Sequence, residues 1–335
     1  MKYVWRIIGI LFLITGLCAC HKKESLDSVY APLKDQRLVI YTSHKEEVYG
    51  PIIKEFEERT GIWVEVVAGG TNELLERIKK ESKDTYCDVM FGGGVENLEA
   101  YSSYFSDYEG KDSHLIDQTY SSTNHKWTAF SALPIVIIYN NKLVHESVAP
   151  SGWNDLLNER WKGKIAFADP YNSGSSYTML ATMMQLNELE PESTLKEFVS
   201  NLDNHILKGS GDVINAVIKG TRLVGITLEE TALKRIAKGA DLTMVYPKEG
   251  TSAVPDGSAI IMGAPNRENA IRFMDFIISE DVQKLIVDQF YRRSVRTDIP
   301  LTEVQKEAIT LIDYNLEWAS SNQDEILEYW STLTQ

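Results

Sequence analysis

The sequence predicts an α/β protein made of two lobes, each with a mainly parallel sheet, joined by a hinge that the chain crosses twice. Within residues 37–101, an apolar strand ends three times in a glycine or hydroxyl turn, and a helix follows each turn. This order is typical of a parallel sheet with crossover helices. A different module starts near residue 131, and the chain returns near residue 260. Two lobes joined in this way can close over a ligand.

The N-terminal residues have the pattern of a secretory signal. Two basic residues precede an apolar run over residues 7–17, which is too short to span a bilayer. The run ends in Leu-Cys-Ala-Cys at residues 17–20, which resembles a bacterial lipobox. This resemblance implies that residues 1–19 are a signal peptide and that Cys20 becomes the lipid-modified first residue of the mature chain. The alternative is an ordinary cleaved signal with a chance cysteine.

Charge and cysteine content limit the partners. The formal net charge of -14 argues against nucleic acid and against an anionic membrane surface as partners. The lipid on Cys20 would then be the membrane contact, and the polar residues 20–36 would be its tether. Outside the signal region the sequence has a single cysteine, Cys87. One thiol cannot form an internal disulfide, so Cys87 is expected to be a buried, small apolar residue.

The first lobe is predicted to comprise residues 37–131 and 260–335. Its expected strands are 38–41, 62–67, 87–91 and 259–263, and its expected helices are 46–60, 72–81, 95–101, 267–279, 281–289 and 302–332. In the first helix, Val48, Ile52 and Phe56 share one face, and Gly61 is a helix stop signal. In an open sheet of this kind, ligands bind beyond the carboxyl ends of the strands, where the turns lie.

The second lobe is predicted to comprise residues 132–259. Its expected strands are 133–139, 165–168 and 223–227, and its expected helical segments are 153–157, 175–186, 197–202 and 213–220. The same alternation of strand and helix predicts a second α/β layer.

A series of motifs, in this order, resembles the type II solute-binding proteins of ABC importers. The motifs are Tyr41–His44 with Phe56–Gly61, Asp88–Gly94, Ala168–Pro170 with Ser173–Thr178, Val224–Glu230, and Tyr291–Arg296. The nearest branch contains ferric-iron, aminoethylphosphonate and hexose-phosphate binders. The resemblance implies a type II periplasmic-binding-protein fold without enzymatic activity or cofactor, and ABC permease subunits as partners. It also implies an exported protein, lipid-anchored to the outer face of the bacterial membrane or located in the periplasm.

Ferric iron is the alternative ligand within this branch. Ferric-iron binders resemble one another in two adjacent tyrosines that coordinate the metal, and this sequence has no Tyr-Tyr pair. At the corresponding place the chain runs through Gly225–Glu230 instead. No metal ligand is therefore assigned, although the 16 tyrosines of the chain leave scattered phenolates open.

Two turns in the second lobe are suited to an anion. Ser173–Ser176 and Gly209–Gly211 each precede a helix, so hydroxyls and backbone N–H groups would meet at helix N-termini, where a phosphate or phosphonate is stabilised. The alternative is that Ser175 or Ser210 is only an N-cap. In the hexose-phosphate branch, an acid at the place of Glu229 resembles one that binds sugar hydroxyls; the alternative is an acid that caps a helix. The residues assigned to the ligand in this lobe are Ser173, Ser175, Ser176, Ser210, Thr227 and Glu229.

The first lobe offers a facing set of turn residues. Glycine lets the backbone approach a ligand closely, and Ser131 lies at the proposed crossing. His44 is expected either to donate to an anion or to cap the following helix. Arg292 and Arg293 are expected to form solvated salt bridges between helices. The residues assigned to the ligand in this lobe are Ser43, His44, Thr71, Gly93, Gly94 and Ser131.

The leading function is capture of a small anionic solute, a sugar phosphate or a phosphonate, for an ABC importer. From a different class, the alternative is an extracellular serine hydrolase that uses Ser43 and His44, or Ser175 with Glu229. The sequence contains no Gly-x-Ser-x-Gly elbow and no paired nucleophile and base motif, which argues against that alternative.

Overall fold

The structure is a computed structural model that describes residues 32–187, 190–305 and 309–334. The predicted signal peptide, Cys20 and most of the predicted tether lie outside the described residues. From Asp35 onward, the described residues form one compact unit.

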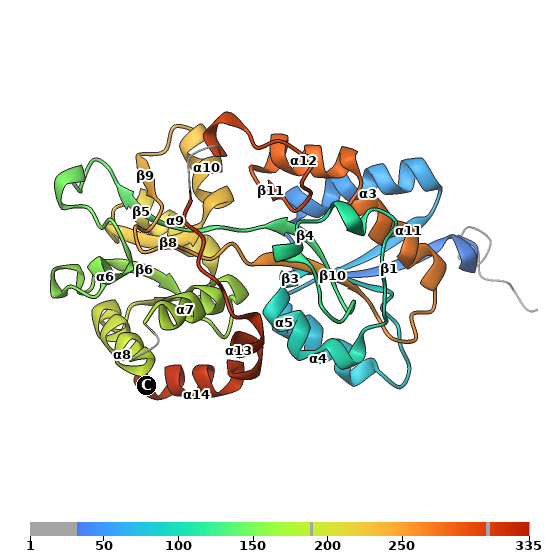
Figure 1. Ribbon diagram of the computed structural model, residues 1–335, viewed down its shortest axis with the longest axis horizontal. Coiled ribbons are helices and arrows are strands. Elements are labelled where there is room, and N and C mark those ends of the chain that lie inside the picture. Colours follow the sequence, from blue (N-terminus) through green and yellow to red (C-terminus); the bar gives the residue numbers. More distant parts are fainter. Residues whose placement is uncertain (1–31, 188–189, 306–308, 335) are drawn as a thin grey trace, which may run out of the picture. The chain divides into compact units, whose positions relative to one another are not determined.

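The first sheet has the strand order β11-β4-β10-β3-β1-β2. Its strands are β1 (Arg37–Thr42), β2 (Trp63–Ala68), β3 (Val89–Gly94), β4 (Thr128–Ala132), β10 (Pro255–Ile260) and β11 (Arg293–Ser294). β1 pairs in parallel with β2 and β3, while β10 runs antiparallel between β3 and β4. Figure 1 shows β10 beside β3, although about 160 residues separate them in the chain.

The second sheet has the strand order β7-β6-β8-β5-β9. Its strands are β5 (Ile135–Asn140), β6 (Ile165–Ala168), β7 (Ile206–Leu207), β8 (Val224–Leu228) and β9 (Leu242–Val245). β6 is parallel to β7 and β8, whereas β5 is antiparallel to β8 and β9. Every residue of β5 is buried, and its alternating side chains enter two different apolar clusters.

The two-lobed α/β class is confirmed, but both sheets are mixed rather than mainly parallel. Only residues 133 and 134 separate β4 in the first sheet from β5 in the second. The chain enters the second sheet from the first lobe at β5 and returns to the first sheet at β10, and each of these strands runs antiparallel to its neighbours. The predicted second-lobe span, 132–259, is too wide at both ends, since Ala132 belongs to β4 and residues 255–259 belong to β10.

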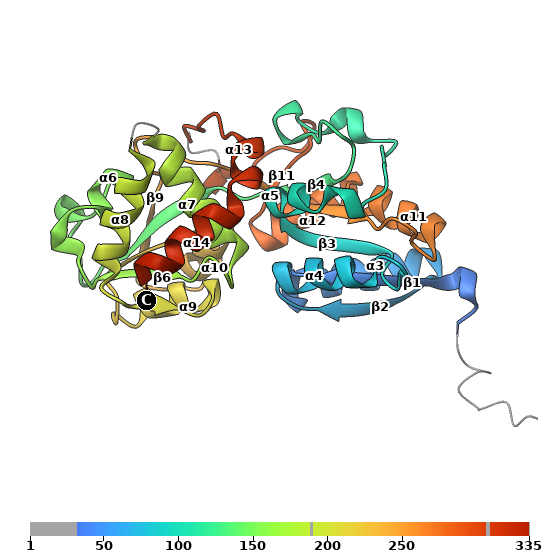
Figure 2. The same cartoon turned by 90° about the horizontal axis from the view of Figure 1, so that it is seen from below.

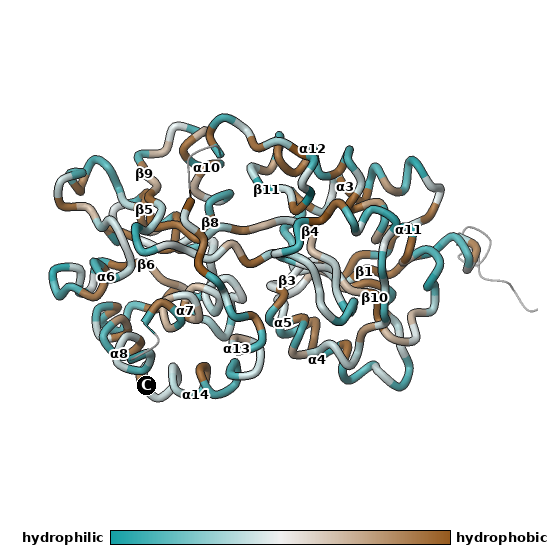
Figure 3. Tube along the Cα trace, in the orientation of Figure 1, coloured by the Kyte–Doolittle hydropathy of each residue, from teal (hydrophilic) through white to brown (hydrophobic). Residues whose placement is uncertain are grey.

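Helices pack on both faces of each sheet. Those of the first lobe are α3 (Glu46–Thr60), α4 (Thr71–Glu81), α5 (Val95–Ala100), α11 (Arg267–Ile277) and α12 (Glu280–Phe290). Those that follow in the second lobe are α6 (Trp153–Leu156), α7 (Gly174–Leu186), α8 (Pro191–Leu202), α9 (Ser210–Ile218) and α10 (Glu229–Ala237). As predicted, α3 ends at Gly61, which has a φ of 70° and donates to the Glu57 carbonyl. In Figure 3, apolar colour marks β1 and β5 while many outer loops are hydrophilic.

The C-terminal residues do not form the continuous helix predicted over 302–332. Residues 309–315 are not helical, because this segment pairs with Thr251: the Thr251 amide donates to the Thr310 carbonyl, and the Ile312 amide donates to the Thr251 carbonyl. Two helices follow, α13 (Leu316–Ser321) and α14 (Gln323–Thr334). Trp330 on α14 packs against Phe167 of the second sheet, with ring centroids 5.7 Å apart. The C-terminal helices therefore do not belong wholly to the first lobe, which corrects the expectation for 260–335; Figure 2 shows α14 near α8.

Two sequence features concern membranes and thiols. Among the described residues, no helix has both the length and the apolar content needed to span a bilayer. Cys87 is buried and free, as predicted, and burial raises the pKa of its thiol well above its ordinary value.

Candidate functional site

The turns after β1 and β2 come together with the glycine-rich carboxyl end of β3, Gly92–Gly94. Added to Gly92, a Cβ atom would lie 2.9 Å from His44 Nε2 and 3.0 Å from Ser43 Oγ. Added to Gly93, it would lie 2.8 Å from Thr71 Cγ2. Gly92 and Gly93 also have φ angles of +99° and +108°, which side-chain-bearing residues rarely adopt. Ser43, His44 and Thr71 thus lie around the end of β3, where glycine is required.

The N-terminus of α7 meets this turn. A Cβ atom added to Gly174 would lie 3.4 Å from Asn97 Nδ2 and 3.9 Å from Thr71 Oγ1. The N-cap is Ser173, whose hydroxyl accepts from the Ser176 amide at 3.3 Å, so Ser175 is not the cap. The Ser175 hydroxyl lies 3.1 Å from that of Ser173. Three hydroxyls therefore gather at the start of a 13-residue helix.

Two other second-lobe residues stand apart from this group. Ser210 is the first residue of α9, but the N-cap is Gly209, without a side-chain cap. No hydrogen bond among the described residues joins Ser210 to the turn at Gly93. Thr227 is buried within β8, opposite Val136 in the pairing with β5.

The carboxylate of Glu229 is occupied by protein groups. Arg293 donates to it twice, from Nε to Oε2 and from Nη2 to Oε1, both at 2.8 Å. The Tyr246 hydroxyl also donates to Oε1. Arg293 is buried, so the expectation of a solvated salt bridge was wrong. Burial removes water from Arg293, which leaves Glu229 as its neutralising partner.

A second buried ion pair lies at the crossing between β4 and β5. Asp256 Oδ1 accepts from the Ser131 amide at 2.9 Å and from the Ser131 hydroxyl at 2.6 Å. Arg292 donates from Nη1 to the Ser131 hydroxyl at 2.9 Å and to Asp256 Oδ2. Arg292 is buried as well, which again contradicts the solvated pair expected from the sequence. The register of β10 shifts at Asp256, and such irregularities turn a side chain out of the regular pleat.

His44 lies beside this pair as a neutral ring. Burial lowers the pKa of His44 to about 4, although the Asp256 carboxylate, 3.6 Å from Nε2, opposes the shift. His44 does not cap the next helix, because the N-cap of α3 is Lys45. Its Nε2 atom has no hydrogen-bond partner among the described residues.

Sequence reasoning missed three buried polar residues in this region: Asp256, Glu96 and Asn97. Glu96 and Asn97 follow the three glycines at the end of β3 after one residue, Val95, and Asp256 is a charged residue in an otherwise uncharged strand. Both features are visible in the sequence. An acid next to a glycine-rich strand end, or inside an uncharged strand, is the signal that could have selected Glu96 and Asp256.

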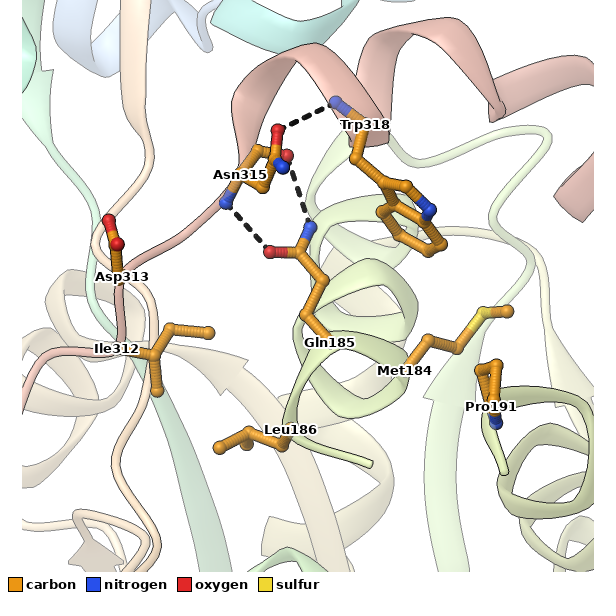
Figure 4. A pocket seen from close by; sticks show the side chains of 8 residues that line it. All are labelled: Met184, Gln185, Leu186, Pro191, Ile312, Asp313, Asn315 and Trp318. Carbon is orange, nitrogen blue, oxygen red and sulfur yellow. Dashed lines mark hydrogen bonds between the residues drawn. The ribbon is translucent and has the colours of Figure 1, made fainter. Parts of the chain in front are cut away.

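The pocket in Figure 4 lies elsewhere. It has a volume of about 590 Å³, and Gln185 and Asn315 exchange hydrogen bonds of 2.8 and 3.2 Å at its wall. Its lining residues are Met184, Gln185, Leu186, Pro191, Ile312, Asp313, Asn315 and Trp318. None of these was selected from the sequence. Across the described ranges, no group of three or more His, Cys, Asp or Glu residues is placed to hold a metal ion.

Comparison with known proteins places the chain in a family. A family model described as bacterial extracellular solute-binding protein matches residues 86–320. Iron uptake protein A1 of Synechocystis is 24% identical over 302 residues, which cover 86% of this chain and 83% of that protein. A putative 2-aminoethylphosphonate-binding periplasmic protein of Salmonella typhimurium is 23% identical, over 80% of each chain. The solved structure of the periplasmic binding protein AfuA from Actinobacillus pleuropneumoniae, with fructose-6-phosphate bound, has a TM-score of 0.82 at 24% identity; the match covers 89% of this chain and 98% of that one.

Proposed function

Because the chain belongs to the family of bacterial extracellular solute-binding proteins, we propose that it captures a small anionic, phosphorylated solute for an ABC importer. It is a substrate-binding protein of such an importer and not an enzyme. The proposal concerns the chemical class of the solute, a sugar phosphate or a phosphonate.

One observation carries the proposal: two helix N-termini meet at the glycine turn of β3. α4 starts at Thr71 and α7 starts at Gly174, and the Cβ position of Gly174 is 3.9 Å from Thr71 Oγ1. The unpaired N–H groups and the dipole of each helix favour a negative charge at this place. Hydroxyls of Thr71, Ser173 and Ser175 add hydrogen-bond donors for phosphate oxygens.

The names of related proteins point to more than one ligand. AfuA was solved with fructose-6-phosphate, and the Salmonella protein is named for 2-aminoethylphosphonate. The Synechocystis protein is named for iron uptake. The organic phosphorus compounds share an anionic group of the kind that helix N-termini bind, which supports the phosphate class.

Calorimetry on the purified full chain, stripped of ligand, tests the proposal. The titrants are a hexose 6-phosphate, 2-aminoethylphosphonate, inorganic phosphate and ferric citrate. We expect a phosphorylated compound to bind, and the double substitution Thr71→Val with Ser175→Ala to weaken that binding about tenfold. Each lost hydrogen bond contributes about 0.5–1.5 kcal/mol, and about 1.4 kcal/mol corresponds to one decade.

Ser193→Ala is the matched control for that double substitution. Ser193 is exposed in the first turn of α8, so its removal should leave the affinity unchanged. Tight binding of ferric citrate, without binding of any phosphorylated compound, would replace this proposal by the iron alternative.

We also propose that the protein is exported and that Cys20 carries a lipid. The support is the apolar run that ends at Leu17-Cys-Ala-Cys20, in a family described as extracellular. The lipid would hold the protein at the membrane that contains the importer.

A further inference from the structure

Two adjacent buried residues on α5 have polar atoms without partners. Glu96 is 0% exposed and Asn97 is 1% exposed. Among the described residues, neither Glu96 Oε2 nor Asn97 Nδ2 has a hydrogen-bond partner. Leaving a buried donor or acceptor unpaired costs about 1–3 kcal/mol for each group. Two such groups side by side therefore suggest a missing partner.

The remaining contacts of the two side chains fix their orientation. Glu96 Oε1 accepts from the Thr178 hydroxyl on α7, and Asn97 Oδ1 accepts from Gln323 Nε2 at 2.7 Å. One end of each group is thus held by the protein. The free ends are an acid oxygen and an amide N–H.

Both free ends lie beside the anion site, the place where Gly92–Gly94 and the N-termini of α4 and α7 meet. A Cβ atom added to Gly94 would lie 2.8 Å from Glu96 Oε2 and 3.4 Å from Asn97 Nδ2. A Cβ atom added to Gly174, the first residue of α7, would also lie 3.4 Å from Asn97 Nδ2. Glycine at both positions therefore leaves room beside the buried acid and amide, where the end of β3 and the N-terminus of α7 meet.

The two free groups together select one kind of ligand atom. An ionised carboxylate oxygen accepts a hydrogen bond, and an amide nitrogen donates one. An ammonium group could satisfy only Glu96. A phosphate oxygen could pair with Asn97, but with Glu96 only while the carboxyl carries a proton. A hydroxyl both donates and accepts, so it can satisfy both.

We propose that Glu96 and Asn97 form a hydroxyl-binding subsite beside the anion site, so that the captured solute is a hydroxylated phosphate ester of the sugar-phosphate class. This inference rests on the proposed function. It transfers the sugar-binding role that the sequence suggested for Glu229 to Glu96, because Arg293 and Tyr246 already occupy Glu229. Burial raises the pKa of Glu96 to about 7, which agrees with a carboxyl that has no cation as partner.

The test compares two affinities in each variant of the full chain. Dissociation constants for glucose 6-phosphate and for inorganic phosphate are measured by calorimetry in wild type, Glu96→Gln, Asn97→Ala and the control Glu73→Gln. Glu73 is an exposed acid in the first turn of α4. The wild type should prefer glucose 6-phosphate, and Glu96→Gln and Asn97→Ala should each reduce this preference about tenfold or more while phosphate still binds. Glu73→Gln should leave the preference unchanged.

The outcomes separate the subsite from the anion site. Phosphate binding that survives in a variant also shows that the variant is folded; if Glu96→Gln does not fold, Asn97→Ala decides. An unchanged preference in the folded variants, or a wild type that prefers inorganic phosphate, overturns the subsite and leaves the anion proposal standing. A wild type that binds no phosphorylated compound overturns the proposed function and the subsite together.

Discussion

Arg293 and Glu229 form an ion pair that water reaches poorly, and this burial determines the effect of breaking it. Arg293→Met would leave the Glu229 carboxylate, which is 1% exposed, without its cation. An uncompensated buried charge typically lowers stability by about 3–5 kcal/mol. We expect the free energy of unfolding, measured by urea denaturation, to fall by that amount.

The exposed pair of Lys284 with Glu280 on α12 is the control for this substitution. Lys284→Met should lower the free energy of unfolding far less than Arg293→Met does, because water screens both charges. Equal losses in the two variants would show that the Glu229 pair is not desolvated.

The buried carboxyl of Glu96 should make stability depend on pH. Its pKa is raised from 4.5 to about 7 in the folded chain, so the folded protein keeps a proton that the unfolded chain loses. This contribution to stability is full below about pH 4.5 and is lost as the pH rises through about 7. His44, with its pKa lowered from 6.5 to about 4, has the opposite slope, since its contribution is lost as the pH falls from 6.5 through 4.

The variant Glu96→Gln separates the pH effect of the Glu96 carboxyl on stability from that of the His44 imidazole. The difference in free energy of unfolding between wild type and variant should change by roughly 3 kcal/mol between pH 4.5 and pH 8, since one pKa unit corresponds to about 1.4 kcal/mol. Urea denaturation at several pH values gives this difference, in which the His44 effect cancels. A difference that is constant with pH would mean that Glu96 has an ordinary pKa.

At the scale of elements, the cap of α7 can be assigned to one serine. Ser173→Ala removes the acceptor of the Ser176 amide and should lower the free energy of unfolding by about 1 kcal/mol. Ser175→Ala should cost less, because the Ser175 hydroxyl accepts from no backbone N–H among the described residues, and Ser173→Asp should restore the cap. Chemical denaturation of the three variants checks this order; equal effects of the two alanine substitutions would contradict it.

The elements also show what local sequence can predict. The apolar run at 38–41 predicts β1, and Gly61 after a helical face predicts the end of α3. Both predictions were possible because strand burial and helix termination depend on neighbouring residues. The antiparallel place of β10 depends on pairing with strands more than 100 residues away, which no local pattern encodes. For the same reason, the sequence did not exclude a helix over 309–315, where the chain pairs with residue 251 instead.

Part of the candidate site was also predictable from local sequence, and part of it was not. Turns after the strands were predictable, because carboxyl ends of parallel strands share one edge of a sheet, and Ser43, Thr71 and Gly93 do come together. The partners of Arg292 and Arg293 lie 36 and 64 residues away. Their burial, and the loss of Glu229 as a free acid, follow from those distant contacts.

At the scale of the whole molecule, the lipid proposal predicts where the protein is found in the cell. Cys20→Ala removes the thiol that would be acylated, and the variant should move from the membrane fraction to the soluble fraction. Fractionation followed by immunoblotting measures this, with Cys87→Ala as the control because Cys87 is buried in the folded domain. A Cys20→Ala protein that remains with membranes as wild type does would rule out this anchor.

Solute entry should require movement between the two sheets. Contacts from α7 to the first lobe cover the candidate site, among them Thr178 with Glu96 and the approach of Gly174 to Asn97. A solute can reach buried Ser173 and Asn97 only if these contacts open. We therefore expect a smaller radius of gyration with solute than without, measured by small-angle scattering on the ligand-stripped chain; an unchanged radius at saturation would contradict closure about the crossings.

The central position of β10 in the first sheet has a consequence for the order of assembly during synthesis. β3 and β4 are finished by residue 132, yet they are joined only through β10, which the ribosome adds more than 120 residues later. Until then, each of the two strands has an unpaired edge, and such edges promote association with other chains. Completion of the first lobe must therefore wait until residues 255–260 are available, so the nascent chain passes through a stage that depends on protection from aggregation.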